Sequence, residues 1–189
     1  ILDGKGKGIK IGWEGIRNWT PNQGALWVHL DYTSPETRKW ITEEAGIDEI
    51  PRQTLLETET RPRSILHDDG LLITLRGVNL LPQSDPEDMV AVRLWIGKNR
   101  IISTRNRRLL SFNDMQKSLE NGKGPKTPGE FLVDLCDRLV DRMADVIDQI
   151  DDDVDNLHEQ VLTMESHQLR PVIASSRRQA IGLRRYLAP

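Results

Sequence analysis

The feature that most constrains the fold is a long, regular apolar pattern between residues 132 and 161. Apolar side chains recur there at steps of three and four residues, in an eleven-residue repeat that averages about 3.67 residues per turn. This period predicts one nearly straight helix, which from Gly129 to Thr163 would extend about 50 Å at 1.5 Å per residue. Such a helix needs partners along its apolar stripe, in the same chain or in other subunits. The stripe consists of Leu132, Leu135, Leu139, Met143, Val146, Ile150, Val154, Leu157 and Val161.

A row of acidic residues follows the same predicted helix, on the side opposite the apolar stripe. Six of the twelve residues in 145–156 are aspartates, and 134–165 carry eleven acids against only two arginines, Arg138 and Arg142. We expect these two arginines to point elsewhere and to leave most of the row unneutralised. Carboxylates four residues apart on a helix repel one another by a few tenths of a kcal/mol per pair. The simplest interpretation is a helix surface that faces water.

The alternative interpretation is that divalent cations gather along this row. Carboxylate oxygens bind hard cations directly or through water, and an imidazole adds a ligand that suits Zn²⁺. The most specific candidates, which share one flank of the predicted helix, are Asp151, Asp155, His158 and Glu159. The full candidate set also contains Asp148 and Asp152. One helix seldom completes a metal site, so a second helix or a second chain would have to contribute.

A second helix is predicted from about Leu169, where apolar residues again share one face. Arg170, Arg177 and Arg184 are spaced seven residues apart and flank that face. Residues 168–189 carry five arginines and no acid, so the two predicted helices have opposite charge. The short connection between them favours an antiparallel helical hairpin.

The first part of the chain alternates predicted strands and helices, which is typical of an α/β (α+β) fold. The predicted strands are 26–32, 70–81, 89–96 and 100–105, and the predicted helices are 33–46, 48–57 and 111–122. The last two strands are joined by Gly-Lys-Asn, a compact turn that predicts a hairpin. We expect Ser34 and Ser111 to cap helices, and Gly46 and Gly122 to end them.

A break in the pattern divides the chain into two predicted domains. Three glycines and two prolines lie within 121–130 and forbid continuous regular structure. We therefore predict an α/β domain over 1–122 and a helical extension, an antiparallel helix pair, over 123–189. No run approaches the ~18 apolar residues that a membrane span requires, so no span is expected within these residues.

Motifs for enzymatic chemistry are missing from the sequence. It contains no nucleophile elbow, no His-Glu-x-x-His zinc motif and no glycine-rich phosphate loop. The single cysteine, Cys136, excludes an internal disulfide and paired-cysteine zinc sites, and we interpret it as a small core residue. His29, His67 and His167 are isolated in the sequence. We therefore expect that the protein is not an enzyme.

A basic cluster at 103–110 raises the possibility of nucleic-acid binding. Arg105, Arg107 and Arg108, together with the arginines of 177–185, could contact phosphates. Few aromatic residues lie among them, however, and the whole chain has a net charge of -3. Salt bridges to the acidic helix or to another subunit agree with the pattern at least as well, so no nucleic acid is expected as a partner.

Five segments stand out when the chain is taken as a whole. They are LWVHLDYTSPETRKWI (26–41), ETRPRSILHDDGLLITLRGVN (59–79), MVAVRLWIGKNRIISTRNRRLL (89–110), FLVDLCDRLVDRMADVIDQIDDDVDNL (131–157) and LRRYLAP (183–189). In this order they resemble the cytoplasmic domain of the CorA superfamily of divalent-cation transporters, and within it the ZntB zinc-transport branch most. The resemblance covers nearly the whole chain.

The resemblance implies a mixed β-sheet flanked by helices, followed by a long-helix hairpin extension of funnel type. It implies a homo-oligomer, a pentamer, around a central pore, with two membrane helices after the soluble part. The family's Gly-Met-Asn tripeptide does not occur in this sequence. Because the chain begins at Ile1 and stops within a helical pattern, we expect a fragment of a longer protein. That protein is expected in the cell inner membrane, with this fragment on the cytoplasmic side.

The resemblance also suggests a role for the acidic row. In such funnels acidic helices raise the local concentration of cations, and metal bound between subunits can bias the pore. Our hypothesis is that the carboxylates of 145–159 attract or sense Zn²⁺ as a transported or regulatory ion. Mg²⁺ or another divalent cation stays open, and so does a scaffold or regulatory domain whose long helix pairs with a protein partner.

Overall fold

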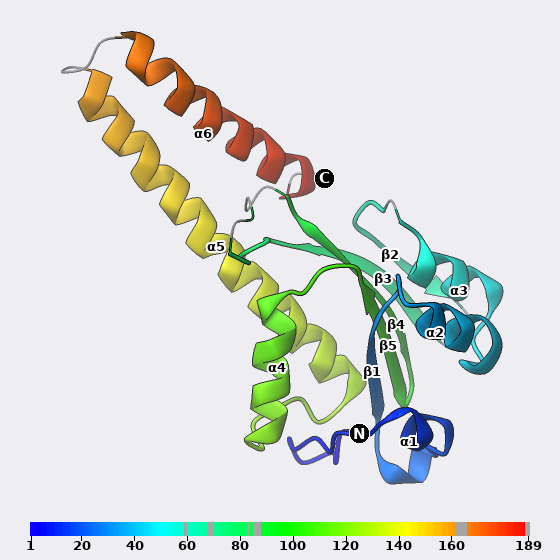
Figure 1. Ribbon diagram of the computed structural model, residues 1–189. Helices are drawn as coiled ribbons and strands as arrows, with labels where there is room; N and C mark the ends of the chain where they lie inside the picture. The colour runs from blue at the N-terminus through cyan, green and yellow to red at the C-terminus, as the bar shows by residue number, and fades with distance from the viewer. Residues whose placement is uncertain (59, 68–69, 83, 85–87, 162–165, 188–189) are drawn as a thin grey trace.

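A five-stranded sheet forms the centre of the structure, and a long helical hairpin projects from it (Figure 1). The structure is a computed structural model that describes residues 1–58, 60–67, 70–82, 84, 88–161 and 166–187. The strands are β1 (Leu26–Asp31), β2 (Arg63–His67), β3 (Gly70–Gly77), β4 (Val90–Gly97) and β5 (Arg100–Arg105). Their order is β1-β5-β4-β3-β2, with β1 parallel to β5 and every other pair antiparallel. The predicted mixed sheet flanked by helices is therefore confirmed.

The helices lie around this sheet and beyond it. Their bounds are α1 (Trp13–Arg17), η1 (Pro21–Gln23), α2 (Pro35–Lys39), η2 (Trp40–Glu44), α3 (Glu49–Leu56), α4 (Leu110–Glu120), α5 (Pro128–Val161) and α6 (Ser166–Leu187). Gly46 and Gly122 follow helix ends with φ angles of 58° and 72°, a left-handed conformation that glycine adopts without steric cost. Both predicted stops are confirmed. None of the helices in the described ranges is long and apolar enough to cross a membrane.

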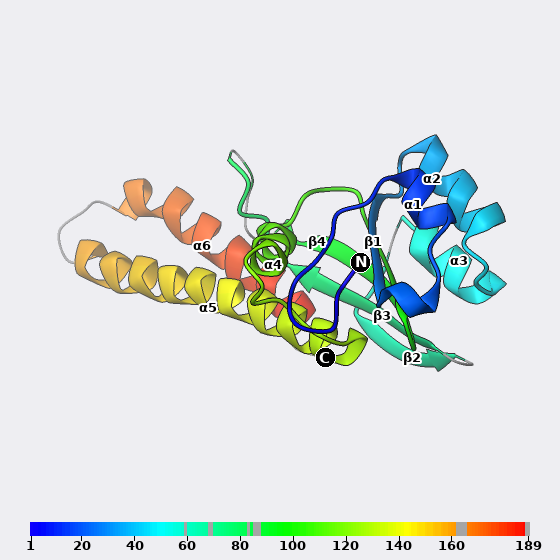
Figure 2. The same ribbon diagram turned by 90° about the horizontal axis from the view of Figure 1, so that it is seen from below.

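Two apolar clusters cover the two faces of the sheet. On one face, α4 and the first turns of α5 pack on β3, β4 and β5, as seen in Figures 1 and 2. On the other face, α2, η2 and α3 bury Trp40, Ile41 and Leu55 against β1 and β5. Strands β4 and β5 therefore contribute apolar side chains to both clusters. The sheet is a fixed platform from which α5 starts.

The first third of α5 belongs to the sheet core. Phe131 and Leu135 are fully buried, Leu139 is 4% exposed, and the Phe131 ring lies 4.8 Å from the ring of Trp27 on β1, measured between centroids. The remainder of α5 leaves the sheet and packs on α6 in an antiparallel hairpin (Figure 1). There Val146 of α5 and Leu183 of α6 share a small cluster with residues near the end of β3 and the start of β4. The predicted long helix and the predicted hairpin are both present.

Three local features differ from the sequence-based expectations. Helix α4 begins at Leu110, so Ser111 lies inside the helix and does not cap it. The Ser111 hydroxyl instead donates a hydrogen bond to the backbone carbonyl of Arg138 at 3.3 Å. Ser34 occupies the N-cap position of α2 but makes no side-chain capping bond. Strand β2 was not predicted. It is the exposed edge strand, and its sequence lacks the alternation of apolar and polar residues that marks a half-buried strand.

We expect Phe131→Ala to lower the free energy of unfolding by about 3–5 kcal/mol, because it leaves a cavity between α5 and the sheet. Urea denaturation followed by tryptophan fluorescence measures this change. The control is Leu66→Ala on the edge strand, where Leu66 is 80% exposed and the change is expected to stay within about 0.5 kcal/mol. Equal losses for the two variants would show that α5 is not anchored in the core.

Candidate functional site

The acidic row occupies the outer part of α5, beyond the sheet. The six candidate metal ligands Asp148, Asp151, Asp152, Asp155, His158 and Glu159 are all exposed. They lie on the portion of the helix that extends away from the α/β domain in Figure 1. This portion carries the densest run of carboxylates in the chain, so it presents a strongly negative surface to solvent.

A single copy of the chain does not close a metal site at these residues. Among the described residues, no group of three or more His, Cys, Asp or Glu side chains is arranged so that it could hold a metal ion. Carboxylates along one helix point outward side by side, whereas a coordinated ion needs ligands that converge on it. The row in one chain is thus suited to diffuse attraction of hydrated cations, and direct ligation at these six residues stays a prediction.

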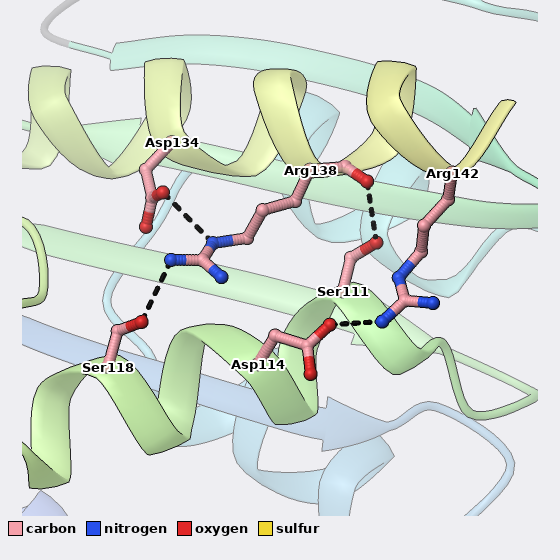
Figure 3. A network of polar contacts seen from close by, with 6 residues as sticks. All are labelled: Ser111, Asp114, Ser118, Asp134, Arg138 and Arg142. Carbon is pink, nitrogen blue, oxygen red and sulfur yellow. Dashed lines mark hydrogen bonds and ion pairs between the residues drawn. The ribbon is translucent and has the colours of Figure 1, made fainter. Parts of the chain in front are cut away.

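The two arginines of α5 form a joint with α4 (Figure 3). Arg138 donates from Nε to Asp134 Oδ1 at 2.9 Å and from a terminal nitrogen to Ser118 Oγ at 2.9 Å. Arg142 forms an ion pair with Asp114 of α4. The expectation that both arginines point away from the acidic row is therefore wrong for Arg138, which neutralises Asp134, the first member of the row.

This joint separates α5 into two regions of different character. In the part of α5 that lies near the sheet, Arg138 forms an ion pair with Asp134. The backbone carbonyl of Arg138 also accepts a hydrogen bond from the hydroxyl of Ser111. Beyond Arg142, the described part of α5 has no basic residue except His158. The part of α5 beyond Arg142 therefore presents a run of carboxylates with no arginine or lysine among them.

The basic cluster at 103–110 finds partners within the α/β domain. A terminal nitrogen of Arg105 lies 3.9 Å from Oδ2 of Asp31 on β1, and Arg107 forms an ion pair with Asp88. In the ion pairs of the described residues, neither arginine contacts an acid of α5. The interpretation of this cluster as a partner of the acidic helix is therefore not supported within one chain.

His29 is the centre of a polar network that the sequence did not reveal. Arg105 donates from Nε to His29 Nε2 at 3.1 Å, so Nδ1 carries the proton and donates to Ser103 Oγ at 2.8 Å. Ser103 also accepts from Trp27 Nε1 at 3.0 Å and donates to the carbonyl of Val28 at 3.2 Å. Burial and the neighbouring Arg105 charge lower the pKa of His29 to about 3. The ring is therefore neutral near pH 7 and holds β1 to β5.

Cys136 has the character predicted from the sequence. It is partly buried on α5, and burial raises the pKa of its thiol. A protonated thiol is a poor nucleophile and a poor metal ligand. Of the other histidines, His67 lies with its Nε2 3.7 Å from Oδ2 of Asp48. The side chain of His167 is outside the part of the chain that the structure describes.

A family model described as "CorA-like Mg2+ transporter protein" matches residues 22–189. The divalent cation transporter CmaX of Pseudomonas aeruginosa is 41% identical over 197 residues, which span all of this chain and 58% of CmaX. The zinc transport protein ZntB of Cronobacter sakazakii is 38% identical over 169 residues, which span 86% of this chain and 50% of that protein. The chain thus spans about half the length of these relatives.

Solved structures agree with these sequence matches. A full-length CmaX structure superimposes with a TM-score of 0.89 over 100% of this chain and 58% of that chain, at 41% identity. The ZntB cytoplasmic domain from Vibrio parahaemolyticus has a TM-score of 0.74 over 85% of this chain and 63% of that chain, at 27% identity. The mixed sheet with its helices and long helix is therefore a fold that this chain shares with these proteins.

We expect the ion pair between Arg142 and Asp114 to stabilise the joint by about 0.5–1 kcal/mol, since both side chains are only about one-third exposed or less. A double-mutant cycle with Arg142→Met and Asp114→Asn, measured by urea denaturation, gives this coupling energy. The coupling should fall at high salt because exposed charges are screened. A coupling of zero at low salt would contradict the joint.

The His29 network predicts a pH dependence of stability. Because folding lowers the pKa of His29 from 6.5 to about 3, the unfolded state binds a proton between these values that the folded state does not. Stability should therefore decrease as the pH falls below 6.5, by roughly 1.4 kcal/mol per pH unit from this group. Urea denaturation from pH 7 to pH 5 measures the slope. In a His29→Gln variant this contribution is absent, so the slope of the unfolding free energy against pH should be smaller by up to about 1.4 kcal/mol per pH unit. A slope equal to that of the unaltered chain would contradict this account.

Proposed function

The chain belongs to the CorA-like Mg2+ transporter family, and from this membership we propose that it is the cytoplasmic, cation-attracting part of a divalent-cation transporter that moves Zn²⁺. The whole protein then resides in the cell inner membrane, and this part assembles with other copies, five in the proposed funnel, on the cytoplasmic side. Its role is assembly, cation attraction and gating rather than chemical conversion of a substrate.

The observation that carries this proposal is the exposed acidic row on the projecting part of α5. Negative charge that extends into solvent raises the concentration of divalent cations within a Debye length, which is about 8 Å at physiological ionic strength. Several copies around one axis would add their fields. Ions entering or leaving a pore between the copies would then meet a locally higher cation concentration.

The choice of Zn²⁺ rests on two supports. The relatives named ZntB are zinc transport proteins, and the row includes His158, an imidazole that suits Zn²⁺ better than Mg²⁺. The alternative ion is Mg²⁺, which prefers oxygen ligands and keeps several waters, so it would use the aspartates alone. A scaffold role, in which the helix pairs with an unrelated protein, is the alternative from another class.

We expect neutralisation of the six candidate ligands to weaken Zn²⁺ binding at least about tenfold, since it removes both charge and ligands. The variant combines Asp148, Asp151, Asp152 and Asp155 to Asn with His158 and Glu159 to Gln. Isothermal titration with ZnCl₂ and with MgCl₂ measures affinity and stoichiometry for both ions. Tighter Mg²⁺ than Zn²⁺ binding by the unaltered chain would favour the alternative ion.

A control variant outside the six candidate residues tests whether any loss of carboxylates from the row weakens binding, and it is compared with Asp148→Asn and Asp152→Asn, which remove the same number of charges within the candidate set. Asp141→Asn with Asp145→Asn removes two carboxylates of the same row that are not candidate ligands. We expect this variant to retain most of its Zn²⁺ affinity. Unchanged affinity in the sixfold variant would remove these residues from the account, and a chain that binds neither ion would favour the scaffold role.

A further inference from the structure

Helix α5 exposes a mixed surface of apolar and acidic side chains, which runs from the part that packs on the sheet into the part that projects from it. Its residues follow one another at steps of four and three, so they lie along one side of the helix. This acid seam consists of Val133, Asp137, Val140, Ala144, Ile147 and Asp151, all exposed. Val133 and Val140 are 60% and 61% exposed. Val140, Ala144 and Ile147 lie between the two carboxylates of the seam, and a contiguous row of exposed apolar side chains with a polar border is typical of an interaction surface.

Helix α6 has a seam of the same design and of opposite charge. Steps of three and four residues again place its members along one side of the helix. This arginine seam consists of Arg170, Ile173, Arg177, Ile181 and Arg184, all exposed. Ile173 is 46% exposed and Ile181 is 56% exposed. Here too, apolar side chains alternate with charges and remain open.

The two seams do not neutralise each other within one chain. No ion pair between an α5 carboxylate and Arg170, Arg177 or Arg184 is formed in the parts of the helices that the structure describes. The contact between the helices uses other residues, among them Val146 and Leu183, which are buried. The intramolecular hairpin therefore leaves both seams on its outside.

We propose that the acid seam of one copy docks on the arginine seam of a neighbouring copy. Charge complementarity selects this pairing over acid on acid or arginine on arginine, each of which places like charges together. The exposed valines and isoleucines between the charges would be buried by the same contact, at about 25 cal/mol per Å² of apolar surface. This inference rests on the proposed function, and it names the surface through which the copies assemble.

Charge reversal with complementation tests this docking. The acid-seam variant is Asp137→Lys with Ala144→Lys, and the arginine-seam variant is Arg177→Glu with Arg184→Glu. Sedimentation equilibrium of the unaltered chain should show reversible association, and each variant alone should associate at least about tenfold more weakly. An equimolar mixture of the two variants should associate again, because the reversed acid seam then meets the reversed arginine seam.

The control is Asp145→Lys with Asn156→Lys, which changes the charge of α5 by the same +3 at two exposed positions that are not three or four residues from any member of the acid seam. It should associate like the unaltered chain. The docking would be overturned by a monomeric unaltered chain, by a control that associates as weakly as the seam variants, or by a mixture that stays monomeric.

The same samples separate this inference from the proposed function. None of the four substituted seam positions is a candidate metal ligand, so ZnCl₂ titration of the unaltered chain reports on the function independently. If the unaltered chain binds Zn²⁺ but the charge-reversed variants associate as strongly as it does, the docking alone is refuted. Association that follows the reversals without any divalent-cation binding would refute the proposed function alone.

Discussion

The burial of the first third of α5 against the sheet is the interaction on which the rest of the structure depends. Phe131, Leu135 and Leu139 tie this helix to β3, β4 and β5, and each contributes about 1.5–3 kcal/mol when fully buried. Without this anchor the outer part of α5 would depend on α6, on the ion pair between Arg142 and Asp114 and on the small cluster around Val146. A hairpin of two helices alone is a poor platform for a surface that must face a defined direction.

Charge is distributed along α5 in agreement with this division of labour. At the joint with α4, Arg138 and Arg142 neutralise nearby carboxylates and fix the helix against Ser111 and Ser118. Beyond the joint the carboxylates face water, where solvent and salt reduce their mutual repulsion. The same helix is therefore a structural element at one end and an electrostatic surface at the other.

Much of the fold was predictable, because local patterns determine its main elements. The apolar repeat predicted α5, Gly46 and Gly122 predicted helix ends, and the turn between β4 and β5 predicted their hairpin. The edge strand β2 escaped prediction because its exposed residues carry no burial pattern. A strand at an edge is defined by its neighbour, which the local sequence does not show.

The candidate site was less predictable, for a different reason. His29 contacts Ser103 and Arg105, which lie 74 and 76 residues further along the sequence. Arg142 and Ser111 each contact a residue on another helix. Such contacts arise only when strands and helices are assembled. The acidic row itself was visible because all its members lie on one helix, but a row cannot reveal which ligands would converge from elsewhere.

The joint with α4 and the long projecting part of α5, which carries α6 with it, give the hairpin the geometry of a lever arm. From Arg142 to Val161 the helix extends about 28 Å at 1.5 Å per residue. A tilt of about 5° at the joint would therefore displace the far end by roughly 2.5 Å, about half a helical turn in length. A small change at the joint would thus be amplified into a movement comparable with the thickness of one layer of water molecules.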